Sequence, residues 1–185
     1  AAVLAAAWAL PARAPAADTP VTGTVAGGSL SLGLGTAPSF AVTLDGTDRT
    51  ATFTVPVDVE DSTGTGSGWH VTLTSTRDAT GAPVRTPPAG ASTVTAVAST
   101  CTGGTCTDPA GSTAYPVAVP AGATAPAPVG VFAAAADTGM GRFRITPTVQ
   151  VVVPGNASAG TSTSTLTVAV VSGPLRAGQP PAARR

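Results

Sequence analysis

The chain has 185 residues, of which 43% are apolar, 10% charged and 4% aromatic, and its formal net charge is zero. A chain of this length suits one domain that buries about 70% of its unfolded surface. Zero net charge argues against a nucleic-acid-binding protein, because binding to phosphate backbones needs a basic surface. Thr, Val, Gly and Pro dominate where a helical bundle would have Leu, Glu and Lys, and this favours strands over helices.

The first residues are expected to form the end of an export signal. Residues 1–10 are apolar and rich in Ala, and Ala-Pro-Ala at residues 14–16 fits the A-x-A pattern of a cleavage site. A helix packed at the start of the domain is the alternative, and Pro11 and Pro15 argue against it. We therefore predict that residues 1–17 are a truncated signal peptide and that the mature protein is secreted. No later apolar run is long enough to cross a bilayer, so no membrane span is expected in the mature chain.

The two cysteines lie close together in the sequence. Cys101 and Cys106 enclose Thr-Gly-Gly-Thr, and in an oxidising compartment this spacing predicts a local disulfide. Such a small loop stabilises the fold by about 2 kcal/mol on the chain-entropy estimate. A zinc site is disfavoured, because it needs four ligands and only His70 could join the two cysteines. We expect no metal and no cofactor.

Apolar and polar residues alternate from Val21 onward, with turn signals between the runs. This period of two predicts strands that bury one face against a core. Polar residues between the apolar ones, including Thr72 and Thr74, are predicted to face water. The predicted inward positions are Leu30, Leu32, Leu34, Phe40, Val42, Leu44, Ala51, Phe53, Val55, Val57, Val59, Trp69, Val71, Leu73, Val94, Ala96, Ala98, Phe143, Ile145, Val149, Val151, Val153, Leu166, Val168 and Val170.

Several segments between these runs carry turn or edge signals. Asp45-Gly46 predicts a hairpin turn, and the Gly-rich residues 62–68 predict a turn that leads into the next strand. Residues 114–128 are rich in Pro, which cannot donate to a central ladder, so they are predicted to be an edge strand and a connection. Residues 129–136 fit either a strand or a helical turn.

Nine or ten short strands in one domain predict an all-β fold, a single antiparallel β-sandwich of the Ig-like or Greek-key type or a related barrel. Two such sheets would cover each other's apolar faces. The sandwich is expected over residues 18–174, and the polar, Pro-rich residues 175–185 are predicted to be a disordered tail, so the termini are disordered or extended. Residues 156–158 (Asn-Ala-Ser) match the N-glycosylation sequon.

No group of residues predicts a catalytic centre. His70 is the single histidine, and without a G-x-S-x-G elbow it is interpreted as a surface residue rather than a general base. Asp58, Glu60 and Asp61 fit either a calcium site or a solvated strand end, and the EF-hand spacing is absent. A glycan hydrolase would need two carboxylates across a cleft. The acids available for such a pair are Asp58, Glu60, Asp78, Asp108 and Asp137.

Two longer segments and one short segment of the sequence together match a known pattern. In residues 61–73, a Gly-rich turn introduces a strand that begins Trp69-His70-Val71. Residues 159–174 form a closing strand that ends in Val-Ser-Gly-Pro, and an early Gly-Ser-Leu-Ser segment occupies residues 28–31. Together these segments resemble, in the same order, the signatures of the WxL-type surface domains of Gram-positive bacteria.

The resemblance implies a secreted, non-catalytic cell-surface protein that binds the cell wall without a covalent link. Its partner would be peptidoglycan or another cell-envelope polymer, with other surface proteins as further candidates. Val stands at the Leu position of the first Trp-x-Leu motif and at both named positions of the second. The residues at these family positions, and hence the predicted binding residues, are Trp69, His70, Val71, Val168 and Val170.

Three alternatives remain open at this point. Trp69 fits a core aromatic residue as well as it fits a contact residue. The whole protein could also be a fibre or pilus-like subunit in which an exposed strand edge pairs with the next copy. A secreted hydrolase of wall glycan is the third function considered.

Overall fold

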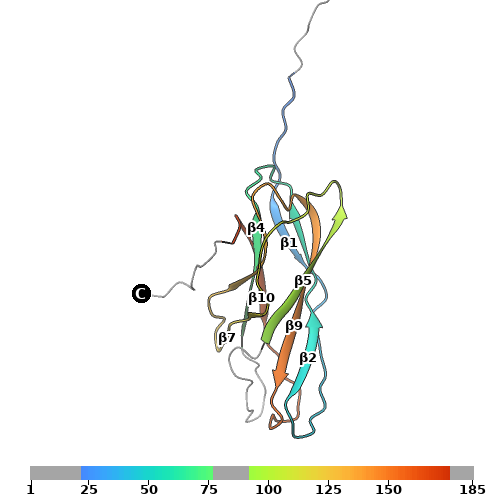
Figure 1. The fold of residues 1–185 in the computed structure, drawn as a ribbon, viewed down its shortest axis with the longest axis vertical. Helices are drawn as coiled ribbons and strands as arrows, with labels where there is room; N and C mark the ends of the chain where they lie inside the picture. The colour runs from blue at the N-terminus through green and yellow to red at the C-terminus, as the bar shows by residue number, and fades with distance from the viewer. Residues whose placement is uncertain (1–21, 77–91, 176–185) are drawn as a thin grey trace, which may run out of the picture.

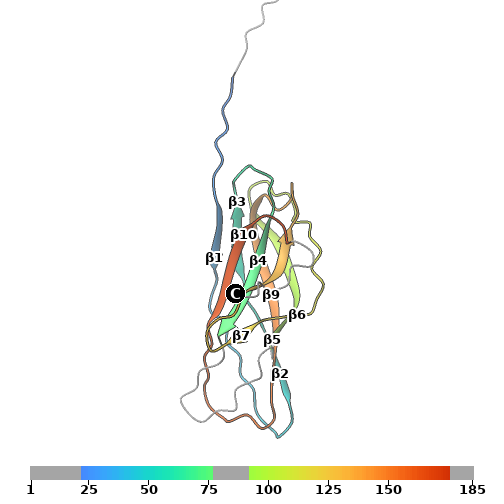
Figure 2. The same cartoon turned by 90° about the vertical axis from the view of Figure 1, so that its left-hand side faces the viewer.

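The computed structural model describes residues 22–76 and 92–175, which form ten strands and contain no helix. They build two sheets that face each other (Figures 1 and 2), and every strand pair except β4–β7 is antiparallel. The predicted all-β sandwich is therefore confirmed. In chain order the strands are β1 (Leu30–Leu34), β2 (Arg49–Thr54), β3 (Val57–Asp61), β4 (Trp69–Thr76), β5 (Ser92–Gly103), β6 (Val117–Ala118), β7 (Ala121–Gly122), β8 (Val129–Ala134), β9 (Gly141–Val153) and β10 (Leu166–Ser172).

The large sheet has the strand order β1-β3-β9-β5-β6, and β2 also pairs with β9. β2 and β3 lie end to end along β9 in one continuous register. The ladder is interrupted at Pro56, which has no N–H to donate, although Val55 still donates to the Pro147 carbonyl at 3.0 Å. The one strand predicted for residues 51–60 is therefore divided into two.

The small sheet is built around β4. β10 pairs with one side of β4, and β8 and the short β7 pair with the other. Residues 129–136, for which a strand and a helical turn are both possible from sequence, contain β8, so the strand is correct. The Pro-rich residues 114–128 contain the short strand β6 at the edge of the large sheet and β7 in the small one, as their composition predicts.

The inner faces of the two sheets form one apolar core. Burial alternates along β3 and β9 as the period of two predicts, and each fully buried aliphatic side chain contributes about 1.5–3 kcal/mol. The buried residues of this core are Val55, Val57, Val59, Trp69, Val71, Leu73, Val94, Val119, Val131, Ala134, Phe143, Ile145, Val149 and Val151.

Residues 40–44 are not a strand, contrary to the prediction. The Phe40 ring stacks on Phe53 of β2 with ring centroids 5.6 Å apart, and the Asp45 carboxylate accepts the Thr47 N–H at 3.1 Å in the turn. The side chains are thus placed as in a hairpin, but no backbone–backbone hydrogen bond joins residues 40–44 to β2. The alternation of apolar and polar residues predicts which side chains face the core, but it does not predict which backbone groups form hydrogen bonds.

The inward face of β5 is also predicted incorrectly. Val94 is buried, but Ala96 and Ala98 are exposed and Val97 packs against the core instead. The cause is an irregularity in the pairing with β9 between Val94 and Ala96, which shifts the register and exchanges the two faces of the strand. Leu34, at the end of the edge strand β1, is 65% exposed although its position in the alternation is inward.

The outer face of β4 and β8 in the small sheet is covered by the chain itself, whereas β10 keeps exposed residues. Thr72 and Thr74 are predicted to face water but are buried, and the Thr74 hydroxyl donates to the Pro126 carbonyl at 2.9 Å. Leu175, which the sequence places in the tail, is half-buried and lies directly over Gly130 of β8. The connection before β8 and the segment after β10 therefore cross this face.

The predicted disulfide is present. Cys101, near the end of β5, is bonded to Cys106, and their Cα atoms lie 6.1 Å apart. Residues 1–17, Asp78 and residues 176–185 lie outside the described part of the chain, and the expectations for them stay predictions. The residues that the structure describes contain no helix long and apolar enough to cross a membrane.

Replacing both cysteines with serine should lower the free energy of unfolding by about 2 kcal/mol, because the unfolded chain then regains the entropy of the open loop. The loop joins residues only five apart, so the Cys101→Ser/Cys106→Ser variant should keep the β-type far-UV circular dichroism of the wild type. Urea unfolding of both proteins, with reduced wild type as the control, measures the difference. Failure of the variant to fold would contradict this local role.

Candidate functional site

The two segments that resemble family signatures lie on neighbouring strands. β4 and β10 pair in antiparallel register, with Val170 opposite Val71 and Val168 opposite Leu73. Val71 is buried, and Val168 and Val170 pack against the core from the sheet edge. The structure thus brings the predicted binding residues together, but the aliphatic ones point into the sandwich.

Trp69 is a core residue. Its side chain is 0% exposed, its Nε1 donates to the Gly139 carbonyl at 2.9 Å, and its ring lies 5.8 Å from that of Phe132. This packing requires glycine at position 139, because a Cβ there would lie only 2.7 Å from the indole nitrogen. Gly68 adopts a φ of 70° immediately before Trp69, a conformation that favours glycine. Of the two alternatives for Trp69, the structure shows the buried one.

His70 lies on the opposite face of β4 and is half-buried. Its Nδ1 lies 2.7 Å from the Gly173 carbonyl, to which it donates in the matching tautomer. The Gly173 N–H donates in turn to the Gly68 carbonyl at 2.9 Å. His70 therefore fastens the segment after β10 to the small sheet, and its hydrogen-bond partner is a backbone carbonyl rather than a carboxylate.

The acidic residues considered for catalysis or calcium binding do not converge. Asp58 and Glu60 point outward from β3, whereas Asp61 is buried and accepts the Thr63 hydroxyl at 2.7 Å. The described residues contain no group of three or more His, Cys, Asp or Glu that could hold a metal ion. The other described acids of the predicted set, Asp108 and Asp137, are exposed in loops.

Asp58 and Glu60 each form an ion pair with an arginine of β9. The Arg144 guanidinium donates to both carboxylate oxygens of Asp58, at 2.9 and 3.0 Å, and Arg142 Nε lies 3.2 Å from Glu60 Oε2. The hydrogen bonds from Arg144 hold the pKa of Asp58 below its ordinary value of 3.8; partial desolvation opposes this effect and charge attraction adds to it. The sequence places both arginines on the outward side of their strand, but it does not identify their partners.

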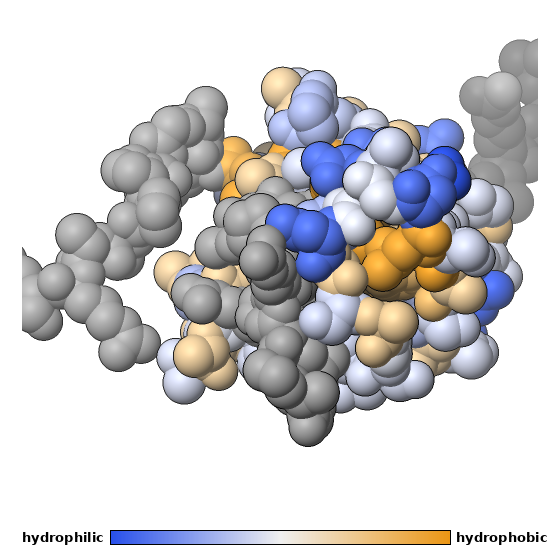
Figure 3. Space-filling model, turned by 90° about the horizontal axis from the view of Figure 1, so that it is seen from below, coloured by the Kyte–Doolittle hydropathy of each residue, from blue (hydrophilic) through white to orange (hydrophobic). Residues whose placement is uncertain are grey.

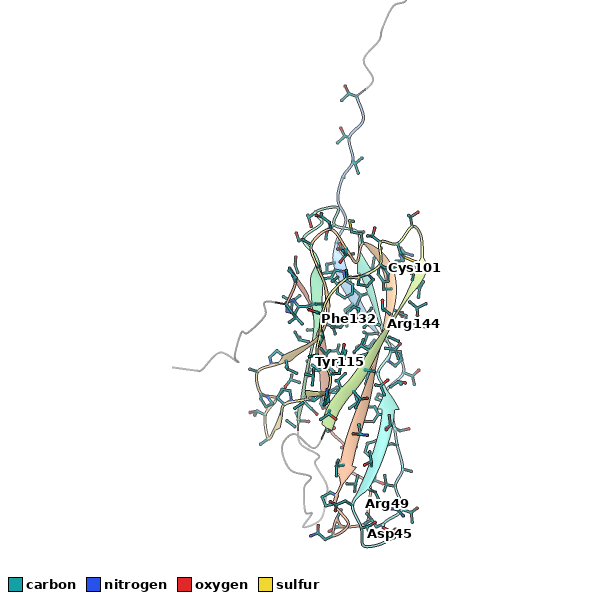
Figure 4. The ribbon with its side chains drawn as sticks, viewed as in Figure 1. Asp45, Arg49, Cys101, Tyr115, Phe132 and Arg144 are labelled. Atoms are coloured by element: carbon teal, nitrogen blue, oxygen red, sulfur yellow. A yellow bond between two sulfur atoms is a disulfide. The ribbon has the colours of Figure 1, made fainter. Side chains whose placement is uncertain are left out.

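These pairs belong to an open polar surface on the large sheet. Strand register sets its side chains in rows about 4.8 Å apart across β2, β3, β9 and β5, and no other segment is hydrogen-bonded across it among the described residues. Its members are all exposed or half-buried, and Figure 4 shows Arg144 on this sheet between Cys101 and Arg49, nearer to Cys101. We call this surface the outer polar face. Its polar members are Thr50, Thr52, Thr54, Asp58, Glu60, Thr93, Arg142, Arg144, Thr146, Thr148 and Gln150, and the exposed Ala96, Ala98 and Val152 lie among them.

The outer polar face ends in an open hollow beside the disulfide loop. The hollow has a volume of about 300 Å³, and Glu60 and Arg142 line it together with Ser62, Gly104 and Gly141. The Glu60–Arg142 pair therefore joins the flat surface to this hollow. The outer polar face and the hollow together have the shape and the polar groups to bind an extended polar molecule.

Exposed apolar side chains are scattered by comparison. Figure 3, a view of the end where β2 begins, shows hydrophobic atoms bordered closely by hydrophilic ones. Single exposed apolar residues are normal on a soluble protein and do not mark an interface. The large ones in the described chain are Val25, Leu34, Phe40, Val152 and Val171.

Removal of Arg144 should raise the pKa of Asp58 toward 3.8, because its main hydrogen-bond donor is lost. The stabilisation by this pair is fully present above the unfolded-state pKa and is lost as the pH falls through the lower folded-state pKa. NMR titration of the Asp58 carboxyl carbon in wild type and Arg144→Ala measures the shift. Arg142→Ala is the matched control, and it should leave the pKa of Asp58 unchanged. The same Asp58 pKa in all three proteins would contradict the claim that Arg144 lowers it.

Comparisons with known proteins place this chain in no family. No family model matches it, and neither the curated proteins nor the solved structures contain a significant match. The likeness to WxL-type domains consequently rests on the two sequence segments, now seen to be the paired strands β4 and β10 with the turns beside them.

Proposed function

We propose that this protein is a secreted, non-catalytic module of the cell surface that binds peptidoglycan, or a related envelope polymer, without a covalent link. The observation that carries the proposal is the contrast between the two sheets. The outer face of β4 and β8 in the small sheet is covered by the chain, whereas the outer polar face of the large sheet is open and rich in hydrogen-bonding groups. The resemblance to WxL-type domains supports the same class of ligand.

The chemistry of the outer polar face suits a glycan with attached peptides. Hydroxyl and amide side chains such as Thr52 and Gln150 can donate to and accept from sugar hydroxyls and acetamido groups. The two arginines balance the two carboxylates, so the surface presents both signs of charge without a strong net field. A polymer that carries both carboxylates and amines meets no repulsion there. Each contact is weak, and a long polymer that engages many of them gains affinity through multivalency.

The roles of the family positions differ in this proposal from those that the resemblance implies. Trp69, Val71, Val168 and Val170 hold β4 and β10 against the core, and His70 fastens the segment that follows β10. They build the scaffold that presents the outer polar face and do not themselves contact the ligand. The disulfide supports the predicted secretion, because such bonds persist in oxidising compartments.

The purified protein should sediment with Gram-positive cell-wall sacculi. Thr54→Ala/Thr148→Ala removes two neighbouring hydroxyls of the outer polar face and should weaken binding about tenfold, at about 0.5–1.5 kcal/mol for each lost hydrogen bond. The matched control is Thr167→Ala/Ser172→Ala, which removes two exposed hydroxyls of β10 and should bind as wild type.

Stability provides a second control for this experiment. Trp69→Phe removes the donor to Gly139 and should lower the free energy of unfolding by about 1–3 kcal/mol while binding to sacculi is retained. Wild type that stays in the supernatant would refute the proposed function. If the Thr54→Ala/Thr148→Ala variant bound sacculi as tightly as wild type, the outer polar face would not be the binding surface.

A self-assembling structural subunit is a second candidate, favoured by β10. This strand has one sheet neighbour, and its seven residues include neither Pro nor a charged residue that would guard the free edge. Under this function, light scattering should show larger species as the concentration rises, and Ala169→Lys should abolish them. A strict monomer at all concentrations would exclude it.

A further inference from the structure

The connection between β9 and β10 concentrates hydroxyl groups on the surface. Six of the eight residues from 158 to 165 are Ser or Thr, and the connection contains no charged residue. All six side chains are exposed. They are Ser158, Thr161, Ser162, Thr163, Ser164 and Thr165.

Within the described residues, these hydroxyls close no turn and hold no covering segment. Some other Thr and Ser side chains do so, as Thr63 does with Asp61 and Thr74 does with Pro126. The hydroxyls of Ser158 and of residues 161–164 form no hydrogen bond with another described residue. Within the described part of the chain, no side-chain hydrogen bond therefore accounts for the hydroxyl groups gathered here.

The connection is fastened at its two ends, and between them its Ser and Thr side chains are exposed although Thr163 takes part in one backbone bridge. At the start, Ala157 N–H donates to the Pro154 carbonyl at 2.9 Å, and Gly155 N–H donates to Asp48 at the same distance. At the end, Thr165 N–H donates to the Thr76 hydroxyl at 2.8 Å. The connection follows the lower end of β9 in Figure 1, at the end of the molecule opposite to Cys101 in Figure 4. A modifying enzyme could reach it without opening either sheet.

We propose that this connection is an O-glycosylation site, at which Ser and Thr hydroxyls of residues 158–165 receive hexose units as the protein is exported. Ser/Thr-rich segments are the acceptors of O-linked sugars in mucin-like stalks, where Pro accompanies them; here Pro154 lies at the start of the connection. The donor would be a sugar linked to a polyprenyl phosphate, and the catalyst a membrane-bound transferase.

The transfer is a substitution at the anomeric carbon of the sugar. The Ser or Thr oxygen forms the new bond to that carbon, and the bond from the carbon to the phosphate oxygen breaks. The polyprenyl phosphate leaves with the electron pair, and a base of the transferase takes the hydroxyl proton. No oxidant or reductant is needed, because no atom changes its oxidation state.

The full-length protein secreted by the organism that makes it provides the test. Its intact mass should exceed that of the polypeptide by whole hexose units, and electron-transfer fragmentation should place them within residues 158–165. An unmodified mass would overturn the proposal. Sugar found only on Asn156, the exposed acceptor of the N-glycosylation sequon, would overturn it as well.

A loop variant and a matched control confirm the location. Replacement of residues 161–164 by Ala, produced in the same organism, should remove most of the added mass. Thr36→Ala/Ser39→Ala/Thr43→Ala removes three exposed hydroxyls from another irregular segment and should keep all of it. Full modification of the loop variant would contradict the proposal. Both readouts are masses, so they are independent of whether the protein binds cell walls.

Discussion

Burial of Trp69 between the sheets is the interaction on which the rest of the small sheet depends. The indole N–H is satisfied by the Gly139 carbonyl, as a buried donor must be, and the ring packs on Phe132 of β8. One side chain thus connects β4, β8 and the turn before β9. The space for the ring exists because Gly139 carries no Cβ. Gly68, without a Cβ, lets the turn before Trp69 pass close to the Ala134 and Ala135 carbonyls, so this Gly-rich turn is part of the packing as well as of the chain reversal.

The two outer faces of the sandwich differ because the chain covers β4 and β8 in the small sheet and leaves the large sheet open. Hydroxyls on the small sheet are buried under the connection that contains Pro126, and His70 binds the segment that follows β10. On the large sheet, Arg142 and Arg144 neutralise the neighbouring carboxylates and leave the hydroxyl rows in solvent. Recognition on this face would depend on many directional hydrogen bonds rather than on a strong electric field, which agrees with the zero net charge of the chain.

Sequence patterns predict this fold well where one side of a strand meets the core and the other meets water. Residues 51–60 and β9 satisfy that condition, and their alternation matches their burial closely. The pattern fails at Ala96 and Ala98, because an irregular pairing exchanges the faces of β5, and at Thr74, because a distant segment covers it. It also fails for residues 40–44, whose side chains keep a hairpin arrangement without a backbone ladder. Each failure has a non-local cause.

The sequence by itself determined the all-β class, the inward residues of most strands and the disulfide, because these follow from the two-residue period of a strand and from a spacing of five residues. Only the tertiary structure decided that Trp69 is a core residue, which sheet face stays open, and that Arg142 and Arg144 meet carboxylates more than 80 positions away. Local periodicity specifies how a segment orients its side chains. Which segments become neighbours depends on how the two sheets pack, and that is a property of the whole chain.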